Sequence, residues 1–461
     1  MSEPPASESR GVLDLDEPKE PIAPRYSAVK RMLASAATTA LLQVASLVLG
    51  FATSVVIART LGRDEYGRYV FALAWASLLI IPAVLGLDRF LVRGIAVYEE
   101  EKNWAHMRGL LRRTNQALVL TSLVIAGAGT LIALEWLAHP LRLPFCVAML
   151  LVPFTALTLA RQATMQALGR TITGQLPEYA LRPVLILAGV GILALVGKGD
   201  LTSSSALAVN VTGVALAFAL GALLLRRALP AAMRSTKATY ATSEWLRASL
   251  PMMLINGIWA ANSYVTTLAV GTLSGTRGAG VYSVAQRGAE LIVVLLLAAN
   301  MPLAPAIAKL HTRGDRAGLE HTTERVAQAT LLVSAPLAAV LIVFPGLYLG
   351  IFGTAFRTGT TALTILAVGQ LVNAAVGPAG NVLLMTGNER AAMRGIGVGL
   401  LVNLVLAIVL VPGLGVTGGA IAFASSLVLW NIVLVVLARR RVGINATAFS
   451  RLAMARPTQE S

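Results

Sequence analysis

Residues 58–75 read ARTLGRDEYGRYVFALAW, and this short charged stretch lies between two long apolar segments. Within it, Gly67 permits a tight turn and Tyr69 is suited to the membrane interface. Residues 270–287, VGTLSGTRGAGVYSVAQR, repeat the Gly-x-Tyr pattern at Gly280, 213 residues later. The recurrence predicts two related halves, each beginning with two helices joined by a turn on the outer face of a membrane. The alternative is that tight membrane hairpins use glycine and tyrosine in general.

The composition is typical of a membrane protein. Hydrophobic residues make up 56% of the 461 residues and charged residues only 13%, whereas a soluble domain is usually about 45–50% apolar and about 25% charged. The net charge of +16 raises the question of nucleic-acid binding. The basic residues lie between apolar runs and form no continuous stripe, so we expect no nucleic-acid partner.

The apolar runs are long enough to cross a membrane as helices. A helix needs about 20 apolar residues to cross about 30 Å of hydrocarbon, and it satisfies its own backbone hydrogen bonds. The runs do not alternate apolar and polar residues, which excludes a transmembrane barrel. The twelve predicted spans are 36–58, 69–91, 115–137, 143–160, 177–197, 203–225, 249–272, 281–304, 326–349, 360–385, 392–411 and 415–438.

The distribution of charge orients these spans. With the N-terminus in the cytoplasm, 28 of the 38 Lys and Arg residues fall in or at the edges of cytoplasmic segments, and seven fall in outer loops. Cytoplasmic loops are enriched in Lys and Arg, so we expect a multi-pass protein of the bacterial cytoplasmic membrane with both termini cytoplasmic. Residues 1–31 read as a disordered tail and residues 444–461 as a second tail. The loop 97–114 is expected to form a short helix on the membrane surface, since it carries Trp104 and a basic end.

A chain that repeats after six spans predicts an all-α integral membrane protein with two pseudo-symmetric six-helix lobes. We expect the N-lobe at residues 32–230 and the C-lobe at 231–443, around a central cavity. Because six is even, both lobes begin on the same side, and the pseudo-symmetry axis runs along the membrane normal. This architecture suits a transporter whose two bundles rock about the cavity.

Neither a cofactor nor an enzymatic activity is expected. The single cysteine, Cys146, forms no internal disulfide, and the four histidines match no metal-ligand spacing. The glycines at 395–399 and 191–200 lack the context of a nucleotide-binding loop. A membrane enzyme such as a glycosyltransferase would need Asp, Glu or His residues clustered in a sizeable loop, and no loop here is long enough or acidic enough.

Residues 41–96 resemble the start of the bacterial polysaccharide or O-antigen flippases. These form the polysaccharide-transporter branch of the multidrug/oligosaccharidyl-lipid/polysaccharide exporter superfamily. The second half is similar to the same proteins at GAGVYSVAQRGAELI (278–292), MPLAPAIAKLHTRGD (301–315) and LVPGLGVTGGAIAFASS (410–426). The resemblance runs over about residues 35–445, and the order of the motifs is more specific than any one of them.

This resemblance implies a flippase that carries a lipid-linked oligosaccharide from the cytoplasmic to the outer leaflet, for polysaccharide biosynthesis. The expected partners are this substrate, membrane lipids and polysaccharide-assembly proteins. Relatives often carry an acid in the seventh span, before a glycine equivalent to Gly271. Here Thr266 and Thr267 occupy that region, which puts ion coupling through this helix in doubt.

Charged residues inside the spans are the candidate substrate-binding residues, because a charge near the bilayer centre is costly. Arg182 follows Glu178 by four residues, and Glu290 follows Arg287 by three, so each pair can meet on one helix face. Guanidinium groups bind phosphate oxygens and stay charged, which suits a pyrophosphate-linked substrate. The alternative is that these pairs join helices. Arg89 is also a candidate, although a side chain near a helix end can reach the headgroups instead.

Amide side chains within the spans are candidates for binding sugar hydroxyls. The strongest are Gln286, Asn262 and Asn373, and hydrogen bonding between helices is the alternative role of each. Two other functions within the superfamily stay open. A drug/cation antiporter would need unpaired intramembrane acids, and a peptidoglycan-precursor flippase usually has two extra spans.

Overall fold

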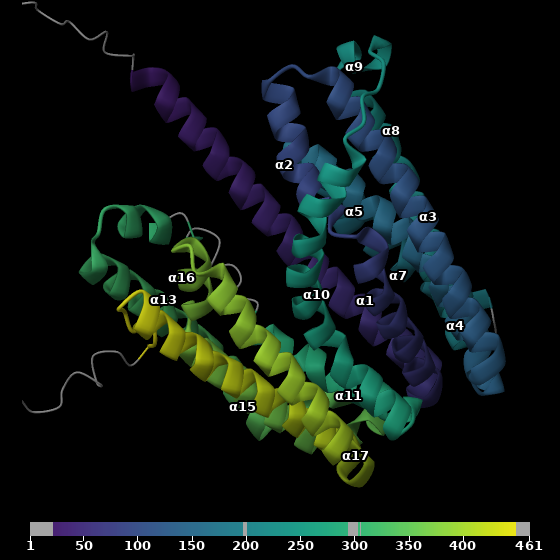
Figure 1. Cartoon of the computed structure of the whole chain (residues 1–461). Coiled ribbons are helices and arrows are strands. Elements are labelled where there is room, and N and C mark those ends of the chain that lie inside the picture. The colour runs from purple at the N-terminus through teal and green to yellow at the C-terminus, as the bar shows by residue number, and fades with distance from the viewer. Residues whose placement is uncertain (1–21, 197–200, 294–302, 305, 449–461) are drawn as a thin grey trace, which may run out of the picture.

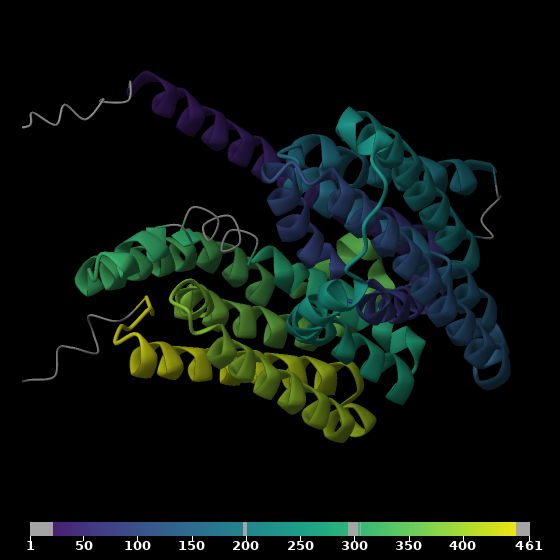
Figure 2. The same ribbon diagram turned by 45° about the horizontal axis from the view of Figure 1, so that its top comes forward.

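The computed structural model describes residues 22–196, 201–293, 303–304 and 306–448, and these residues form helices and turns without any strand (Figure 1). Figures 1 and 2 show an N-terminal and a C-terminal bundle side by side, in contact at one end and diverging toward the other. The chain is therefore an all-α, two-lobed membrane protein, as the length of the apolar runs predicts. The division between the lobes at residues 230 and 231 stays a prediction.

The N-terminal bundle follows the first six predicted spans closely, with the fourth and the fifth each built from consecutive pieces. Its helices are α1 (Ile22–Val84), α2 (Leu87–Glu100), α3 (Trp104–Trp136), α4 (His139–Met149), α5 (Leu151–Ala167), α6 (Thr171–Leu176), the π-helix η1 (Pro177–Leu181), α7 (Arg182–Val196) and α8 (Ser203–Ala228).

The C-terminal bundle begins after the short helix α9 (Ala231–Ser235). Its helices are α10 (Thr242–Leu273), α11 (Thr276–Leu291), α13 (Arg316–Val343), α14 (Pro345–Phe352), the 3-10 helix η2 (Thr354–Gly359), α15 (Thr360–Val376), α16 (Ala379–Met385) and α17 (Glu389–Arg441). Helix α10 contacts both bundles, since it packs against α1, α2 and α17.

Two long helices each supply two crossings. Helix α1 changes direction at Gly62 (φ 69°) and α17 at Gly415 (φ 55°), which is a backbone conformation that favours glycine. Eight described helical segments are long and apolar enough to span a membrane, the two kinked helices among them. Together with α10 and α11, the described helices account for all twelve of the predicted spans.

The turns that begin the two halves lie five residues earlier than predicted. Gly62 and Gly275 (φ 88°) make them, whereas Gly67 and Gly280 lie inside helices. A Cβ atom on Gly67 would lie 2.1 Å from the carbonyl oxygen of Thr276, and one on Gly280 would lie 2.9 Å from the Cα atom of Gly67. The repeated glycines therefore let α1 and α11 touch each other. The tyrosines that follow them are buried rather than at the interface.

No separate surface helix forms over residues 97–114. Helix α2 ends at Glu100, and α3 begins at Trp104 with Asn103 as its N-cap, the side chain of which accepts from the backbone N–H of His106 at 3.3 Å. This cap starts one continuous helix through the charged stretch and the apolar run. The prediction missed the cap because the charge of this stretch suggested a loop.

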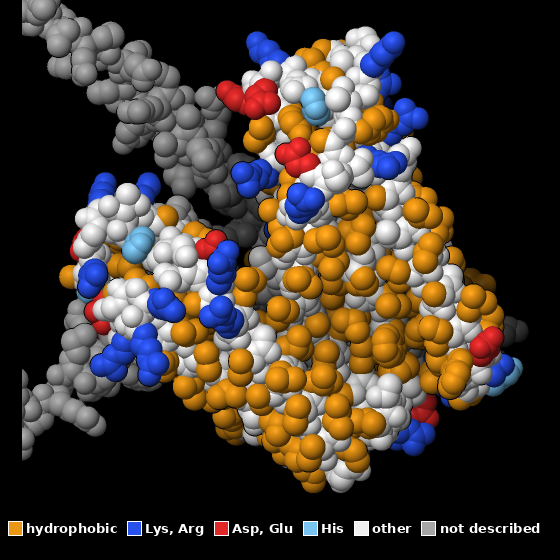
Figure 3. All heavy atoms as spheres, in the orientation of Figure 1, with side chains coloured by type: hydrophobic (Ala, Val, Ile, Leu, Met, Phe, Trp, Pro, Cys, Tyr) orange, Lys and Arg blue, Asp and Glu red, His pale blue; other side chains and the backbone are white. Residues whose placement is uncertain are grey.

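The predicted tails are shorter than expected. Residues 1–21 and 449–461 lie outside the described residues, while residues 22–31 belong to α1. Residues 444–448 pack against the C-terminal bundle, where the backbone N–H of Ala448 donates to the carbonyl oxygen of Ala375 at 3.0 Å. Figure 3 shows hydrophobic side chains over the flanks of both bundles and Lys and Arg gathered at their diverging ends, as expected for a protein in a membrane.

Candidate functional site

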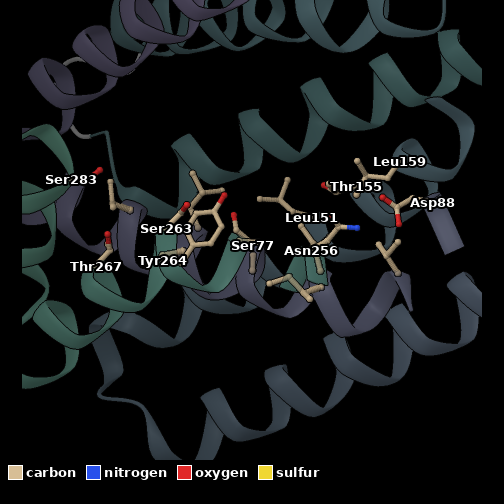
Figure 4. Close-up of a pocket in the computed structure, with 18 of the residues that line it drawn as sticks. Ser77, Asp88, Leu151, Thr155, Leu159, Asn256, Ser263, Tyr264, Thr267 and Ser283 are labelled. Atoms are coloured by element: carbon tan, nitrogen blue, oxygen red, sulfur yellow. The ribbon is translucent and has the colours of Figure 1, made fainter. Parts of the chain in front are cut away.

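A cavity of about 710 Å³ lies between the two bundles. Its walls come from the second half of α1, the start of α2, α5, Arg182 at the start of α7, α10 and α11. Figure 4 shows the lining as an elongated row that runs from Ser283 and Thr267 at one end to Asp88 at the other. The cavity thus lies where a two-lobed transporter is expected to hold its substrate.

Arg182 reaches the cavity from the start of α7 and is held by a polar network. Its Nη1 donates to Oε1 of Glu178 one turn earlier, and its Nη2 donates to Oδ1 of Asn210 on α8 at 3.2 Å. The amide of Asn210 in turn donates to the hydroxyl of Tyr69 at 2.9 Å. The predicted ion pair between Arg182 and Glu178 is therefore present, and Arg182 also lines the cavity.

Arg287 lines the cavity from α11 without an ion-pair partner among the described residues. The expected ion pair with Glu290 does not form. Instead, Glu290 accepts a hydrogen bond from the amide of Gln286 at 2.9 Å, and both of these residues also line the cavity. The guanidinium of Arg287 lies within electrostatic reach of the phenols of Tyr66 and Tyr69.

Tyr69 lies within electrostatic reach of both guanidinium groups. It is buried in the second half of α1, and both Arg182 and Arg287 act on its phenol electrostatically. One cation thus comes from the N-terminal bundle and the other from the C-terminal bundle, and both act on the same phenol. The cavity wall therefore carries a guanidinium group from each bundle, Arg182 in an ion pair with Glu178 and Arg287 in none among the described residues.

Four predicted site residues do not line this cavity, and one of them, Glu178, is the ion-pair partner of Arg182. The side chain of Arg89 is 63% exposed and lies 3.9 Å from Asp88, which is itself part of the lining. Asn262 accepts from the amide of Asn403 at 3.1 Å. Asn373 donates to Gln370 at 3.2 Å and accepts from Asn431 at 2.9 Å. Both asparagines thus join helices, which was the alternative role, since an amide in lipid needs a partner from a neighbouring helix.

Most of the hydroxyl groups on the wall were missed by the prediction. They belong to Ser77, Thr155, Ser263, Tyr264 and Ser283. A hydroxyl group in a helix can bond to the carbonyl of its own preceding turn, so such residues occur throughout membrane helices and give no signal in one sequence. Asp88 had a signal, because it is a charged residue within the predicted span 69–91, but it was not among the candidate site residues.

One end of the cavity is closed by contacts between equivalent positions of the two halves. Arg277 donates from Nε and Nη2 to the two carboxylate oxygens of Asp64 at 2.5 and 2.6 Å, across a separation of 213 residues. Nearby, the Nε of Arg59 donates to the carbonyl oxygen of Ile351 at 2.6 Å. With the contact of Gly67 and Gly280, these bonds form a gate between the bundles.

The family model described as polysaccharide biosynthesis protein matches residues 32–311, which is more than half of the chain. The chain belongs to this polysaccharide biosynthesis protein family. A second family model, MatE, matches residues 251–409 in the C-terminal half. The two matches together cover both bundles and confirm the resemblance drawn from the sequence at the level of the family.

Solved structures show the same fold for this family member. An inward-facing multidrug resistance MATE family transporter of the MOP superfamily aligns with a TM-score of 0.70 and 13% identity, over 88% of this chain and 98% of the other. The lipid II flippase MurJ, in an inward closed conformation, aligns with a TM-score of 0.68 and 14% identity, over 87% of each chain. An outward-facing MATE family transporter gives a TM-score of 0.53 at 13% identity, over 88% and 95%. No curated protein sequence matches the chain.

Proposed function

We propose that this protein is a flippase that moves a polyprenyl-pyrophosphate-linked oligosaccharide from the inner to the outer leaflet of the bacterial cytoplasmic membrane. The observation that carries this proposal is the pair of guanidinium groups, Arg182 and Arg287, on the wall of the cavity between the lobes. A charge inside a membrane protein is expensive and is placed where it has a role. Membership of the polysaccharide biosynthesis protein family supports a step in polysaccharide biosynthesis.

The chemistry of the wall matches both polar parts of such a substrate. The pyrophosphate that joins a polyprenol to a glycan is esterified at both ends and is a dianion, and guanidinium groups bind its oxygens with two parallel hydrogen bonds. Arg287 forms no ion pair among the described residues, and the Glu290 carboxylate that acts on it electrostatically is hydrogen-bonded to Gln286, which leaves the guanidinium able to bind an anion. The serine, threonine and amide groups along the row in Figure 4 provide donors and acceptors for sugar hydroxyls.

The two-lobed fold supports transport by alternating access. The gate at Asp64 and Arg277 closes one end of the cavity, and the bundles diverge toward the other end (Figure 1). The basic residues gathered at the diverging ends favour a cytoplasmic position for that side. The structure then corresponds to an inward-open state, which fits the higher TM-score against the inward-facing transporter.

A drug/cation antiporter is the alternative that a specific observation favours. Asp88 and Glu290 both line the cavity, and the MatE model matches the C-terminal half. Against it, the amide of Gln286 already binds Glu290, and Thr267 lines the cavity in the region where relatives often carry an acid. A peptidoglycan-precursor flippase would use the same pyrophosphate chemistry with a different glycan, but such proteins usually have two spans more than the twelve predicted here.

A transport assay with purified protein in liposomes tests the proposal. The donor is a fluorescent oligosaccharide on polyprenyl pyrophosphate in the inner leaflet, and its appearance in the outer leaflet is measured. We expect transport to stop in Arg182→Leu and Arg287→Leu and to continue in Arg89→Leu, the exposed control. Equal transport of the same glycan on an uncharged polyprenol, or cation-driven export of a cationic dye instead, would overturn the proposal.

A further inference from the structure

A second guanidinium group in the N-terminal bundle does not line the cavity. Arg161 lies in α5, beyond the predicted end of the fourth span, and is only 3% exposed. Its Nη1 donates to the carbonyl oxygen of Gly174 at 3.1 Å, while its Nε and Nη2 have no hydrogen-bond acceptor among the described residues. A buried charge without full pairing destabilises a fold, so packing does not account for an arginine here.

The neighbouring helix has a place for this guanidinium group. A Cβ atom on Gly221 of α8 would lie 2.1 to 2.5 Å from three atoms of the Arg161 guanidinium. The side chain of Arg161 therefore occupies space that α8 leaves open by having glycine at this position. The arrangement is specific, since any larger residue at 221 would displace the charge.

Glu178 is a carboxylate that acts on Arg161 electrostatically. Its Oε1 accepts from Arg182, while its Oε2 is buried without any partner among the described residues. Gly174, which holds Arg161, precedes Glu178 by four residues, so the guanidinium lies beside the same face of this span. The carboxylate attracts Arg161 electrostatically, although the two do not form an ion pair in this state.

Glu178 also lies in a part of the helix that is suited to rearrangement. The π-helix η1 (Pro177–Leu181) contains it and joins α6 to α7. Single π-helical turns are less regular than α-helix and are frequent at functional sites. The carboxylate thus stands between two arginines, with one oxygen engaged on the cavity side and the other oxygen free.

We propose that Arg161 is a positioning residue that forms an ion pair with Glu178 when an anionic substrate binds Arg182. This inference rests on the proposed function, because it requires a pyrophosphate in the cavity. In the substrate-free state, Glu178 neutralises Arg182. When the pyrophosphate binds Arg182, the carboxylate of Glu178 is released from that arginine. It then accepts hydrogen bonds from Nε and Nη2 of Arg161, so it does not remain as an unpaired charge in a buried site. Arg161 in this way tunes how strongly Arg182 binds the anion.

A stability measurement tests the exchange without any substrate. Removing the guanidinium at position 182 has the same effect on Glu178 as binding of that guanidinium by a pyrophosphate. Glu178 should therefore pair with Arg161 in such a variant. We expect Arg161→Leu to lower the melting temperature of purified Arg182→Leu protein by about 3 °C or more relative to its effect in the native sequence. Adding Glu178→Gln should remove this difference. An equal effect of Arg161→Leu in both backgrounds would overturn the proposal.

A binding measurement gives a readout that a purely structural role would not change. Farnesyl pyrophosphate is the probe, and farnesol is the uncharged reference. Arg161→Leu should weaken pyrophosphate binding on the order of tenfold and leave farnesol binding unchanged, since the released carboxylate then opposes the anion. Glu178→Gln should suppress the defect, because no carboxylate is released.

Two glycine variants provide matched controls that keep Arg161 in the chain. Gly221→Ala should reproduce the binding defect because it displaces the guanidinium, whereas Gly191→Ala in α7 should not, since a Cβ atom there meets nothing within 4 Å. Unchanged pyrophosphate binding in Arg161→Leu would count against the exchange. Failure of the native protein to bind farnesyl pyrophosphate would instead refute the proposed substrate, and the melting experiment would still decide the role of Arg161.

Discussion

The contact between α1 and α11 at the gate can be opened with one methyl group. In Gly67→Ala, the new Cβ atom would lie 2.1 Å from the carbonyl oxygen of Thr276, compared with at least 3.4 Å in an ordinary contact. The helices must therefore separate by about 1.3 Å at this point. The new Cβ atom clashes with the backbone of Thr276, so no side-chain rotation relieves the clash. We expect Gly67→Ala to destabilise the state in which the gate is closed.

The size of the effect follows from the cost of overpacking. Inserting a methylene-sized group into a close-packed contact costs about 1–3 kcal/mol. The clash exists only while the gate is closed, so this free energy shifts the equilibrium between the closed-gate and open-gate states. Since about 1.4 kcal/mol is a factor of ten, the population of the open-gate state should rise by about 5-fold to about 150-fold.

Distances between spin labels on the two bundles can measure this shift. Cys146 is the single cysteine, so Cys146→Ser gives a background into which His139→Cys on α4 and Gly413→Cys on α17 place one label on each bundle near the gated ends. Gly67→Ala should populate a longer distance, and Gly50→Ala, where the Cβ atom meets nothing within 4 Å, should not. The reasoning is refuted by a Gly67→Ala distribution identical to that of the control.

Three further predictions test the site and its surroundings. Arg287→Leu should reduce the binding of farnesyl pyrophosphate at least tenfold, as measured by calorimetry, whereas Arg89→Leu should leave it unchanged because Arg89 does not line the cavity. Exchanging the gate charges in an Asp64→Arg, Arg277→Asp double variant should restore the label distances that either single variant changes, because the two side chains face each other; loss of the closed distance in the double variant contradicts this. Asn403→Leu should lower the free energy of unfolding by about 1–3 kcal/mol by leaving buried polar partners unpaired, with pyrophosphate binding unaffected; a binding defect at unchanged melting temperature would contradict it.

The number of crossings could be predicted from the sequence because it depends on the length of apolar runs alone. The turn at residues 58–75 could not be placed, since the stretch contains two glycines. Either of them can adopt a positive φ, and only the approach of α11 shows that Gly67 is needed for space and Gly62 for the turn. Glycine has two uses, and a single sequence does not separate them.

The candidate site was predictable only in part, because a polar residue in a span can have two roles that a single sequence does not distinguish. The cost of a charge in lipid identified Arg182 and Arg287 in the sequence, and both line the cavity. The same reasoning did not identify Arg161, because the fourth predicted span ends at residue 160 and Arg161 therefore lay outside the predicted membrane segment. For Asn262, the sequence could show that a partner was required, but the partner is Asn403, 141 residues away. Distinguishing a helix contact from a substrate contact therefore requires the tertiary structure.

The two halves are alike at the gate and unlike in the cavity, and the geometry of the fold accounts for this. Near a pseudo-symmetry axis each half meets its own equivalent, so Gly67 faces Gly280 and Asp64 faces Arg277. Counted at the same offset of 213 residues, Ala74 is the position equivalent to Arg287, and Gly395 is the position equivalent to Arg182. A gate between two repeats needs matching surfaces, whereas a substrate with an anionic group at one end and a glycan at the other needs a wall that differs from side to side. The repeat is therefore kept where the halves touch each other and is lost where, on our proposal, they touch the substrate.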